Sequence, residues 1–446
     1  MYRRHRYTPR VPTLRPFRGL GYALDRYATP SPPGMRIADL SEVVCPPYDV
    51  ISAAQQSELL SRNDRNAVRL ELSAESDPHA AAAAAIRAWE ADGTLERRAK
   101  PSAYYYRYAR PEAPDDPAVH GVVLRLLLEP FGDGVRAHEH TMAGPKADRL
   151  ALLHATRTQL SPILAIYFDR STHHDHLLGL PWADEWRARD GDGLLHTLAA
   201  VEPDERLLSH LSRQQLYIAD GHHRYETALA YQAAIRDDPA RAEAEPGSLA
   251  ADWIMVVLVN AEREALEIQA THRLVREADA DALRSLVRDP DPIWKASPVA
   301  PADLPRRLAE LQAVEQPVFG LVLPGDEGYL LVGDADLADD RMRREPMSAV
   351  VRRLDLAILQ ATILGDRLGI DPASIATGDA LAYTRSEADA IRAVASGEAK
   401  AAILVRPTRL EQLAAVASAD DVMPQKSTYF YPKLLTGLVF YPLEGE

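Results

Sequence analysis

The sequence predicts a mixed α/β (α+β) protein whose β-sheets are not purely parallel. Apolar runs of strand length, alanine- and leucine-rich stretches with helical spacing, and turn residues that connect neighbouring strands directly support this class. The chain has 446 residues, of which 46% are hydrophobic and 26% charged, an ordinary globular composition. A chain of this length accommodates roughly two to four domains.

The charge and the cysteine content exclude several classes of protein. A formal net charge of −14 has the wrong sign for a protein that coats nucleic acid or an anionic membrane. The single cysteine, Cys45, has no partner for an internal disulfide and is more typical of a buried small residue than of a nucleophile. No apolar run approaches the ~20 residues of a membrane span, and the basic N-terminus lacks the apolar segment of a secretory signal. We therefore expect a cytoplasmic protein without nucleic-acid or membrane partners; nothing in the sequence indicates its oligomeric state.

The first part of the chain is expected to begin without regular structure. Residues 1–35 mix Arg, Pro and Gly without a period, which predicts an extended segment. The apolar residues 43–51 are interrupted by two prolines, so they predict a strand and a rigid turn, and Ser52 is then placed to cap a helix that runs to Leu60. Residues 79–92 are rich in alanine, which loses least on becoming helical, and predict a helix ended by the following glycine.

Strands dominate the next part. Residues 104–108 and 121–129 flank a loop rich in Pro and Asp, which predicts a β-hairpin. Residues 161–169 form another apolar run of strand length. The short run 216–219 predicts a strand that is followed by a tight glycine turn and a helix. Residues 253–260 are continuously apolar, so we expect a strand buried on both faces.

A composition shift marks the C-terminal part. The stretch 277–305 is rich in Asp and Pro, so we predict an extended segment over 1–35, an α/β domain over 36–280 and a second α/β domain over 281–446. The patterns beyond the shift predict a hairpin of strands 319–323 and 328–332, a long amphipathic helix over 347–368, helices over 386–397 and 408–418, and a strand over 401–405.

The densest group of chemically active side chains lies in the strand–turn–helix segment. Its members are Asp220, Gly221, His222, His223 and Arg224, which follow one another directly. A glycine turn lets the backbone approach a ligand, the next N–H groups lie at a helix N-terminus, and His and Arg add donors for phosphate oxygens. Asp220 is placed to hold a Mg²⁺ ion or to accept a proton from a hydroxyl substrate. The alternative is a polar helix cap with two surface histidines.

This segment resembles a known phosphate-binding turn. The pattern Gly221-x-His223-Arg224-x-x-x-Ala228 is similar to the turn of the ParB/sulfiredoxin superfamily, whose members include chromosome-partition CTPases, sulfiredoxins and free-serine kinases. Together with three further segments it resembles, more specifically, the bacterial and archaeal family called domain of unknown function 1015. These segments are Cys45–Ile51, His138–Thr141 followed by Asp148 and Arg149, and residues 423–433 with the sequence MPQKSTYFYPK.

The resemblance implies that a nucleoside di- or triphosphate binds at the turn. Gly221, His223 and Arg224 would contact the phosphates, and Asp220 matches the acid that precedes the turn in the kinase-like members. His222 occupies the position of the reactive cysteine of sulfiredoxins, so sulfinic-acid repair is not expected. The partition factors also carry a helix-turn-helix domain, but the C-terminal part of this chain has no basic recognition helix. We therefore expect no DNA binding.

A second group of candidate residues follows the predicted hairpin. His138 and His140 alternate with Glu139, so the two histidines share one face if a strand continues through them. Three interpretations stay open: a zinc site completed by a histidine of the turn, an active-site role without a transition metal, or a structural role. In the active-site role, Glu139 would be the general base or the Mg²⁺ partner of Asp220.

Three shorter segments complete the set of candidates. Asp148 and Arg149 are either a surface pair or an active-site pair that orients the substrate. Near the C-terminus, Lys426 and Ser427 stand beside three aromatic residues and could hold a phosphate and stack a base, whereas the alternative is a tyrosine-rich strand packed on the core. The polar run 271–273 is a further candidate.

These observations favour a nucleotide-dependent, kinase-like phosphotransferase. We expect it to act on a small hydroxylated metabolite, such as the amino acid serine, with Mg²⁺ and ATP, ADP or CTP as cofactors. The alternatives are a ParB-like nucleotide switch without DNA binding and a metal-dependent hydrolase centred on the histidines. The four motifs are expected to converge in one site. The predicted catalytic residues are Asp220, Glu139, His138 and His222, the predicted metal ligands Asp220 and Glu139, and the predicted cofactor-binding residues Gly221, His223, Arg224, Lys426, Ser427 and Arg149.

Overall fold

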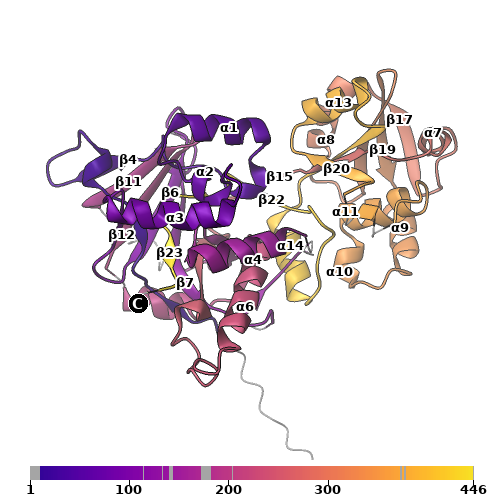
Figure 1. The fold of residues 1–446 in the computed structure, drawn as a ribbon. Helices are drawn as coiled ribbons and strands as arrows, with labels where there is room; N and C mark the ends of the chain where they lie inside the picture. The colour runs from indigo at the N-terminus through magenta and orange to yellow at the C-terminus, as the bar shows by residue number, and fades with distance from the viewer. Residues whose placement is uncertain are drawn as a thin grey trace, which may run out of the picture. The chain divides into compact units, whose positions relative to one another are not determined.

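The chain folds into two compact units, which are described separately. The computed structural model describes residues 11–113, 115–132, 134–139, 144–171, 182–202, 204–371, 374–375 and 378–444 (Figure 1). Unit 1 comprises Met1–Ala137, Met142–Leu266 and Pro432–Glu446, and unit 2 comprises His138–Thr141 and Glu267–Tyr431. The C-terminal residues therefore belong to unit 1. The domain boundaries predicted at 35 and 280 stay predictions. In the structure, Leu266 is the last residue of the second segment of unit 1, and Glu267 begins the long segment of unit 2.

Unit 1 is built on an 11-stranded mixed sheet. Most neighbouring strands are antiparallel, and three pairs are parallel, namely β10 with β14, β13 with β8, and β11 with β4. The mixed α/β class is therefore confirmed. The sheet order is β3 (Ala28–Thr29), β4 (Arg36–Asp39), β11 (Asp184–Arg189), β12 (Leu195–Val201), β6 (Ala103–Ala109), β7 (Val119–Leu127), β14 (Trp253–Asn260), β10 (Ile163–Tyr167), β13 (Leu216–Asp220) and β8 (Val135–Arg136), with β1 (Leu14–Arg15) beside β7.

The centre of this sheet agrees with the sequence pattern. β6 and β7 pair directly as the predicted hairpin. β14 lies between β7 and β10, and every one of its residues is buried, as its continuous apolar sequence predicts. The core on one side of these strands contains Tyr167, Tyr225, Ile254 and Leu258.

Helices of unit 1 begin where capping residues stand. Ser52 forms a capping box with Gln55, and Asp77 caps the alanine-rich helix, so both helices start close to their predicted positions. α3, α4 and α6 pack side by side (Figure 1). The helices are α1 (Ala53–Arg62), α2 (Val68–Glu71), α3 (Pro78–Ala91), α4 (Gly144–Thr156), α5 (Glu205–Leu211) and α6 (His222–Arg236), with 3₁₀ turns η1 (Asp25–Tyr27), η2 (Tyr48–Val50) and η4 (Ala250–Asp252).

Two sequence predictions for the N-terminal part are wrong. The described part of 1–35 is not devoid of regular structure, because it forms β1, β3 and the short strand β2. The apolar run at Cys45 makes only an isolated bridge to Thr436 in place of a strand, since the two prolines end the pairing at once. The small sheets of unit 1 pair β2 (Leu20–Tyr22) with β5 (Leu95–Arg97), and β9 (Thr158–Gln159) with β23 (Tyr441–Pro442).

Unit 2 has a six-stranded sheet of its own. The predicted hairpin is present, because β18 and β19 pair directly around Gly325. The sheet order is β17 (Trp294–Pro298), β19 (Glu327–Gly333), β18 (Val318–Leu323), β21 (Ala401–Val405), β16 (His272–Val275) and β20 (Leu381–Thr384), and a separate pair joins β15 (Glu267–Gln269) to β22 (Tyr429–Tyr431).

The helices of unit 2 include one clear departure from the sequence pattern. The predicted single helix over 347–368 is broken, because Leu354 has an extended backbone (φ −76°, ψ 133°). The helices are α7 (Ala280–Arg288), α8 (Leu304–Glu310), α9 (Ala335–Met342), α10 (Ala349–Arg352), α11 (Asp355–Ile358), the π-helical η6 (Leu359–Gly365), α13 (Glu387–Ala395) and α14 (Leu410–Ser418), with the 3₁₀ turn η5 (Pro301–Asp303). Across the described part of both units, no helix is long and apolar enough to cross a membrane.

Candidate functional site

The segment with the densest chemistry forms a tight turn between β13 and α6. Asp220 ends β13, and His222 begins α6 directly after the glycine. Gly221 between them has φ +90° and ψ 28°, a left-handed conformation. A Cβ atom on Gly221 would lie 2.8 Å from Cγ2 of Ile163 and 3.1 Å from Cζ of Arg224. The turn therefore requires glycine for both its backbone angle and its space.

The Asp220 carboxylate is held between two cations. Its Oδ2 accepts a hydrogen bond from Nη2 of Arg224 at 2.5 Å, and its Oδ1 is paired with Nζ of Lys433. All three side chains are largely buried. Burial acts to raise the pKa of Asp220, but the charges of Lys433 and Arg224 outweigh burial, so the pKa of Asp220 lies well below the usual carboxyl range. Asp220 is thus an anion at neutral pH and a weak proton acceptor.

Arg224 also connects the turn to the start of β10. Its Nη1 donates to the hydroxyl of Ser161 at 3.2 Å and to the carbonyl of Pro162. The guanidinium is therefore fixed at both ends. The first main-chain hydrogen bond at the start of α6 runs from the Tyr225 N–H to the Gly221 carbonyl, and no side chain caps this helix. The N-terminus of an α-helix is a general site of attraction for anions.

A second buried ion-pair network surrounds Arg149. Its Nη1 donates to Oε2 of Glu71 at 3.1 Å, while its Nε donates to Oδ2 of Asp148 at 2.9 Å. The guanidinium lies over the ring of Tyr48, 4.3 Å from the centroid. Thr436 of the C-terminal segment donates to the other oxygen of Glu71 at 3.1 Å. Arg149 and Glu71 are thus buried, whereas Asp148 is 52% exposed and also lies 2.9 Å from Nε2 of His79. An active-site role for Asp148 and Arg149 stays a prediction.

A small cavity lies beside Arg224, which we name the Thr227 cavity. Its volume is about 60 Å³, and its polar lining residues are Tyr48, Glu71, Arg149, Thr158, Gln159, Ser161, Arg224 and Thr227. The hydroxyl of Thr227 is buried and has no hydrogen-bond partner among the described residues. An unsatisfied buried hydroxyl costs about 1–3 kcal/mol. The rest of the lining is mostly apolar and includes Leu152, Leu153, Leu160, Ala228 and Ile254.

Tyr48 contributes a neutral hydroxyl to this cavity. Burial raises the pKa of Tyr48 to about 12, although the nearby Arg224 and Arg149 charges act to lower it. The phenol is therefore protonated at neutral pH and can donate a hydrogen bond.

Unit 2 holds the second group of predicted residues. His138 is fully buried, and its Nε2 lies 2.8 Å from the hydroxyl of Thr428. Glu139 accepts a hydrogen bond from the main-chain N–H of Lys426 at 2.9 Å. The hydroxyl of Ser427 donates to the carbonyl of Pro424 at 2.5 Å. These contacts tie residues 423–428 to the 138–139 segment.

Arg273 lies in the same group of unit 2. Its Nη2 donates to the carbonyls of Gln425 at 3.3 Å and of Lys426 at 3.2 Å. Burial lowers the pKa of Arg273 to about 10, with Tyr383 and Glu139 acting in the opposite direction. Arg273 remains a cation at neutral pH and holds the backbone of the Lys426 turn.

The predicted site residues therefore fall into two groups. Unit 1 brings together Asp220, Gly221, His222, His223 and Arg224, with Arg149 lining the adjoining cavity. Unit 2 brings together His138, Glu139, Lys426 and Ser427. His140 and Thr141 lie outside the described residues. Convergence of the four motifs in one site stays a prediction.

Sequence reasoning missed two residues of unit 1. Both lysines of the segment 423–433 are candidates for a phosphate site in the sequence, which favours Lys426, whereas in the structure it is Lys433 that pairs with Asp220 of the turn. Thr227 could not be predicted, because the sequence does not show that the hydroxyl of this one threonine is buried beside a cavity.

The described residues do not form a ready magnesium or zinc site. Among them, no group of three or more His, Cys, Asp or Glu side chains could hold a metal ion. Both oxygens of Asp220 are engaged by cations, and Glu139 belongs to unit 2. A Mg²⁺ ion normally takes one or two free carboxylates with water and phosphate oxygens. The predicted Mg²⁺ site does not fit Asp220 as it is held here.

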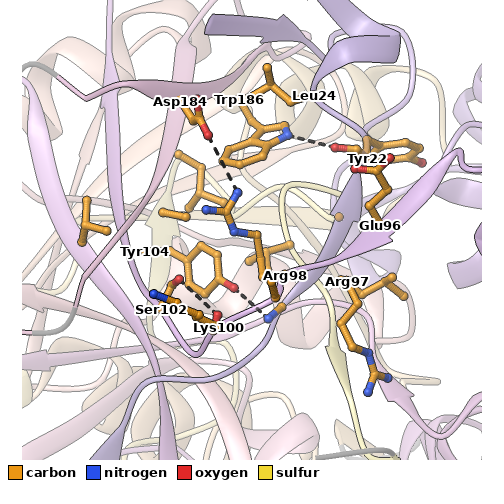
Figure 2. Close-up of a pocket in the computed structure, with 18 of the residues that line it drawn as sticks. Tyr22, Leu24, Glu96, Arg97, Arg98, Lys100, Ser102, Tyr104, Asp184 and Trp186 are labelled. Carbon is orange, nitrogen blue, oxygen red and sulfur yellow. Dashed lines mark hydrogen bonds and ion pairs between the residues drawn. The ribbon is translucent and has the colours of Figure 1, made fainter. Parts of the chain in front are cut away.

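A larger cavity of about 860 Å³ lies elsewhere in unit 1 (Figure 2). Figure 2 shows the guanidinium of Arg98 beside both Asp184 and Trp186, 4.0 Å from Oδ2 of Asp184 and 5.5 Å from the indole centroid. Trp186 donates to the carbonyl of Tyr22 at 2.9 Å, and Tyr104 accepts from the Gly19 N–H at 2.7 Å. These polar groups are already paired with one another, and no residue of the 220–224 turn lines the cavity. We therefore assign the candidate site to the turn and the Thr227 cavity.

Comparisons with known proteins give one family and weak structural likenesses. A model of the family described as "Protein of unknown function (DUF1015)" matches residues 14–357. No curated protein matches the chain. Similar solved structures include a free serine kinase in complex with AMP (10% identity, TM-score 0.33, covering 68% of this chain and 89% of that one). A C-terminally truncated SbnI from Staphylococcus aureus has 12% identity and a TM-score of 0.34, covering 68% of this chain and 82% of that one.

A conserved hypothetical protein from Pyrococcus furiosus has 10% identity and a TM-score of 0.33, covering 67% of this chain and 88% of that one. Scores of this size are too low to transfer a fold or a function.

Proposed function

This chain belongs to the DUF1015 family, and on that premise we propose that unit 1 binds the phosphates of a nucleotide at the 220–224 turn and transfers a phosphoryl group. The acceptor is a small hydroxylated metabolite. In the transfer, the bond between the terminal phosphorus and its bridging oxygen breaks, and the bridging oxygen leaves with the rest of the nucleotide. The acceptor oxygen bonds to the phosphorus, and the proton of the acceptor hydroxyl passes to water.

The observation that carries the proposal is the pair of cations on Asp220. Arg224 and Lys433 converge on one carboxylate at the start of α6, beside Gly221, whose left-handed backbone makes the tight turn. Guanidinium and ammonium groups at a helix N-terminus are the donors that phosphate oxygens require. A phosphate carries more charge than one carboxylate, so it competes with Asp220 for both cations.

Each residue of the turn then has a distinct task. Arg224 and Lys433 neutralise the phosphate charge, and the main chain at Gly221 approaches the phosphate oxygens closely. His223 supplies a further donor. Asp220 holds the two cations in position and does not act as a strong base, because its lowered pKa makes it a weak proton acceptor. Phosphoryl transfer does not require a strong base, because its loose transition state is stabilised mainly by the positioning of the reactants and by the neutralisation of charge.

One observation also favours the alternative of a nucleotide-gated switch. Lys433 belongs to the C-terminal segment and forms an ion pair with Asp220 of the turn. A phosphate that draws Lys433 from Asp220 would change this contact between the turn and the C-terminal segment without any transfer step. The two functions differ in whether a hydroxylated compound gains phosphate.

The test is a binding screen followed by a transfer assay. ADP, ATP and CTP are added to the wild type and to Arg224→Gln and Lys433→Met, and the midpoint of thermal unfolding is measured. Loss of one charge-assisted hydrogen bond weakens binding about 10- to 150-fold, equivalent to about 1.5–3 kcal/mol. Arg87→Gln, an exposed residue on α3, is the matched control and should bind like the wild type.

The proposal fails if none of the three nucleotides shifts the wild-type midpoint. If a nucleotide binds, radiolabelled terminal phosphate is followed onto a panel of hydroxylated metabolites. Label on a metabolite supports the transferase, whereas binding without transfer to any compound of the panel supports the switch.

A further inference from the structure

We propose that the Thr227 cavity is the binding site for the phosphoryl acceptor, and that this acceptor is a hydroxylated compound of a few carbon atoms without net charge. That the bound compound accepts a phosphoryl group rests on the proposed function. That the cavity binds a small hydroxylated compound without net charge is argued from its size, from the Thr227 hydroxyl and from the charges around it.

The size of the cavity limits the ligand. Its volume is about 60 Å³, whereas about 10–15 Å³ of such space holds one water molecule. The cavity therefore has space for roughly four to six waters, or for a compound of about four to seven non-hydrogen atoms. A nucleotide is far too large, so this cavity is separate in purpose from the turn.

The polar groups of the cavity match an alcohol. The Thr227 side chain is 4% exposed, and its hydroxyl has no partner among the described residues. It can donate one hydrogen bond and accept others. The raised pKa of Tyr48 keeps its phenol protonated, so the cavity offers a second hydroxyl. A ligand hydroxyl satisfies both groups, because it too donates and accepts.

The charges around the cavity balance one another. Arg149 is paired with Glu71 and Asp148, and Arg224 is paired with Asp220. Among the described lining residues, Arg149 and Glu71 offset each other, whereas at the turn the two cations Arg224 and Lys433 face the single carboxylate of Asp220. The cavity therefore favours a neutral or zwitterionic compound over a charged one.

Arg224 joins this cavity to the phosphate turn. Its Nη2 is bonded to Asp220 in the turn, while its Nη1 is bonded to Ser161, which lines the cavity. One guanidinium thus reaches both a phosphate at the turn and the hydroxylated compound beside it. This is the adjacency that transfer between them requires.

The experiment compares two substitutions of one residue. Thr227→Val removes the hydroxyl at nearly constant shape, and Thr227→Ser keeps it. Binding of glycerol, L-serine and D-glycerate to each protein is measured by saturation-transfer NMR, and binding of ADP, ATP and CTP by thermal shift in the same samples. Glycerol is neutral, serine zwitterionic and glycerate anionic.

We expect glycerol or L-serine to bind the wild type and Thr227→Ser within threefold of each other, and Thr227→Val at least tenfold more weakly. Glycerate should bind more weakly than the other two. The inference is overturned if Thr227→Val binds the compounds as the wild type does, or if none of the three compounds binds the wild type. These outcomes do not depend on the nucleotide shift, whose absence would overturn the proposed function instead.

Discussion

Lys433 and Asp220 are 213 residues apart in the sequence and meet in an ion pair at the start of α6. The pair joins the C-terminal segment of the chain to the turn that carries the phosphate-binding pattern. Because Arg224 holds the other oxygen of Asp220, the carboxylate is enclosed by two cations. Several measurable consequences depend on this arrangement.

Substitution of Lys433 by Met should destabilise unit 1. The Asp220 carboxylate keeps Arg224 but loses one of its two cations while it remains largely buried. We expect the free energy of unfolding to fall by about 1–3 kcal/mol, measured by urea denaturation. Lys100→Met removes an exposed lysine of the same unit and should leave the free energy within ~0.5 kcal/mol of the wild type. Equal losses in both variants would contradict the pairing.

The Asp220 ion pairs should make stability depend on acid pH. The pKa of Asp220 is lowered in the folded state below its unfolded value of about 3.9. A group of this kind stabilises the folded protein fully above its unfolded pKa, and this stabilisation is lost as the pH falls through the folded pKa. The wild type should exceed Asp220→Asn in unfolding free energy by about 3–5 kcal/mol at pH 7 and pH 5. The difference should shrink below about pH 4; a constant difference down to pH 3 would refute the assignment.

Gly221 should tolerate no side chain. Gly221→Ala places a Cβ 2.8 Å from Ile163 at a left-handed backbone position. Gly34 has nearly the same φ, +85° against +90°, but nothing within 4 Å of the added Cβ. Gly34→Ala should therefore lower the free energy of unfolding only by the cost of a left-handed backbone at a residue with a Cβ, about 1–2 kcal/mol. We expect Gly221→Ala to cost at least ~1 kcal/mol more, and identical losses in thermal or urea unfolding would show that the space at Gly221 is not limiting.

Removal of Arg149 should lower the free energy of unfolding more than removal of an arginine from a surface ion pair. Arg149→Met leaves the Glu71 carboxylate buried, at 4% exposure, with only the Thr436 hydroxyl and without a cation. Loss of one partner from a buried pair costs about 3–5 kcal/mol. Arg36→Met breaks an ion pair with Asp184 in which the arginine is 56% exposed, and should cost no more than about 1 kcal/mol. Comparable losses in the two variants would argue against a buried network.

Thr227→Val should not destabilise the ligand-free protein. The threonine hydroxyl has no partner among the described residues, so its removal eliminates an unsatisfied buried group. We expect the free energy of unfolding to stay unchanged or to rise by about 1 kcal/mol. A loss above ~1 kcal/mol in urea unfolding would mean that the hydroxyl makes a stabilising hydrogen bond after all.

Local patterns predicted the elements whose signals are contained within a few residues. The alanine run fixed α3 because helix propensity and the Asp77 cap agree. The apolar run of β14 was recognisable because a strand buried on both faces has no polar positions. The long helix over 347–368 failed for a tertiary reason. Leu354 is extended, and the adjoining Asp355 starts α11 and pairs with Arg406 at 2.7 Å, a partner that periodicity does not reveal.

The residues of the candidate site also differ in how far they could be predicted from local sequence. Asp220 to Arg224 are consecutive, so the sequence displays their chemistry directly. Lys433 required knowledge that the chain returns to the turn after more than two hundred residues. Lys426 and Ser427 were more prominent in the same segment, yet their described contacts lie within unit 2, where Glu139 and Pro424 hold them. Which lysine contacts the turn depends on burial and on the ion pairs it forms, and neither can be inferred from residue type alone.

The return of Pro432–Glu446 to unit 1 has a consequence for synthesis of the protein on the ribosome. Translation proceeds at about 5–20 residues per second, so roughly 10–40 s pass between the addition of Asp220 and that of Lys433. During this interval Asp220 has only Arg224 as a cationic partner, and the sheet of β9 with β23 cannot form. Phe440 and Tyr441, both fully buried in the folded protein, are added later still. The nascent chain therefore completes unit 1 only after the whole of unit 2 has been made.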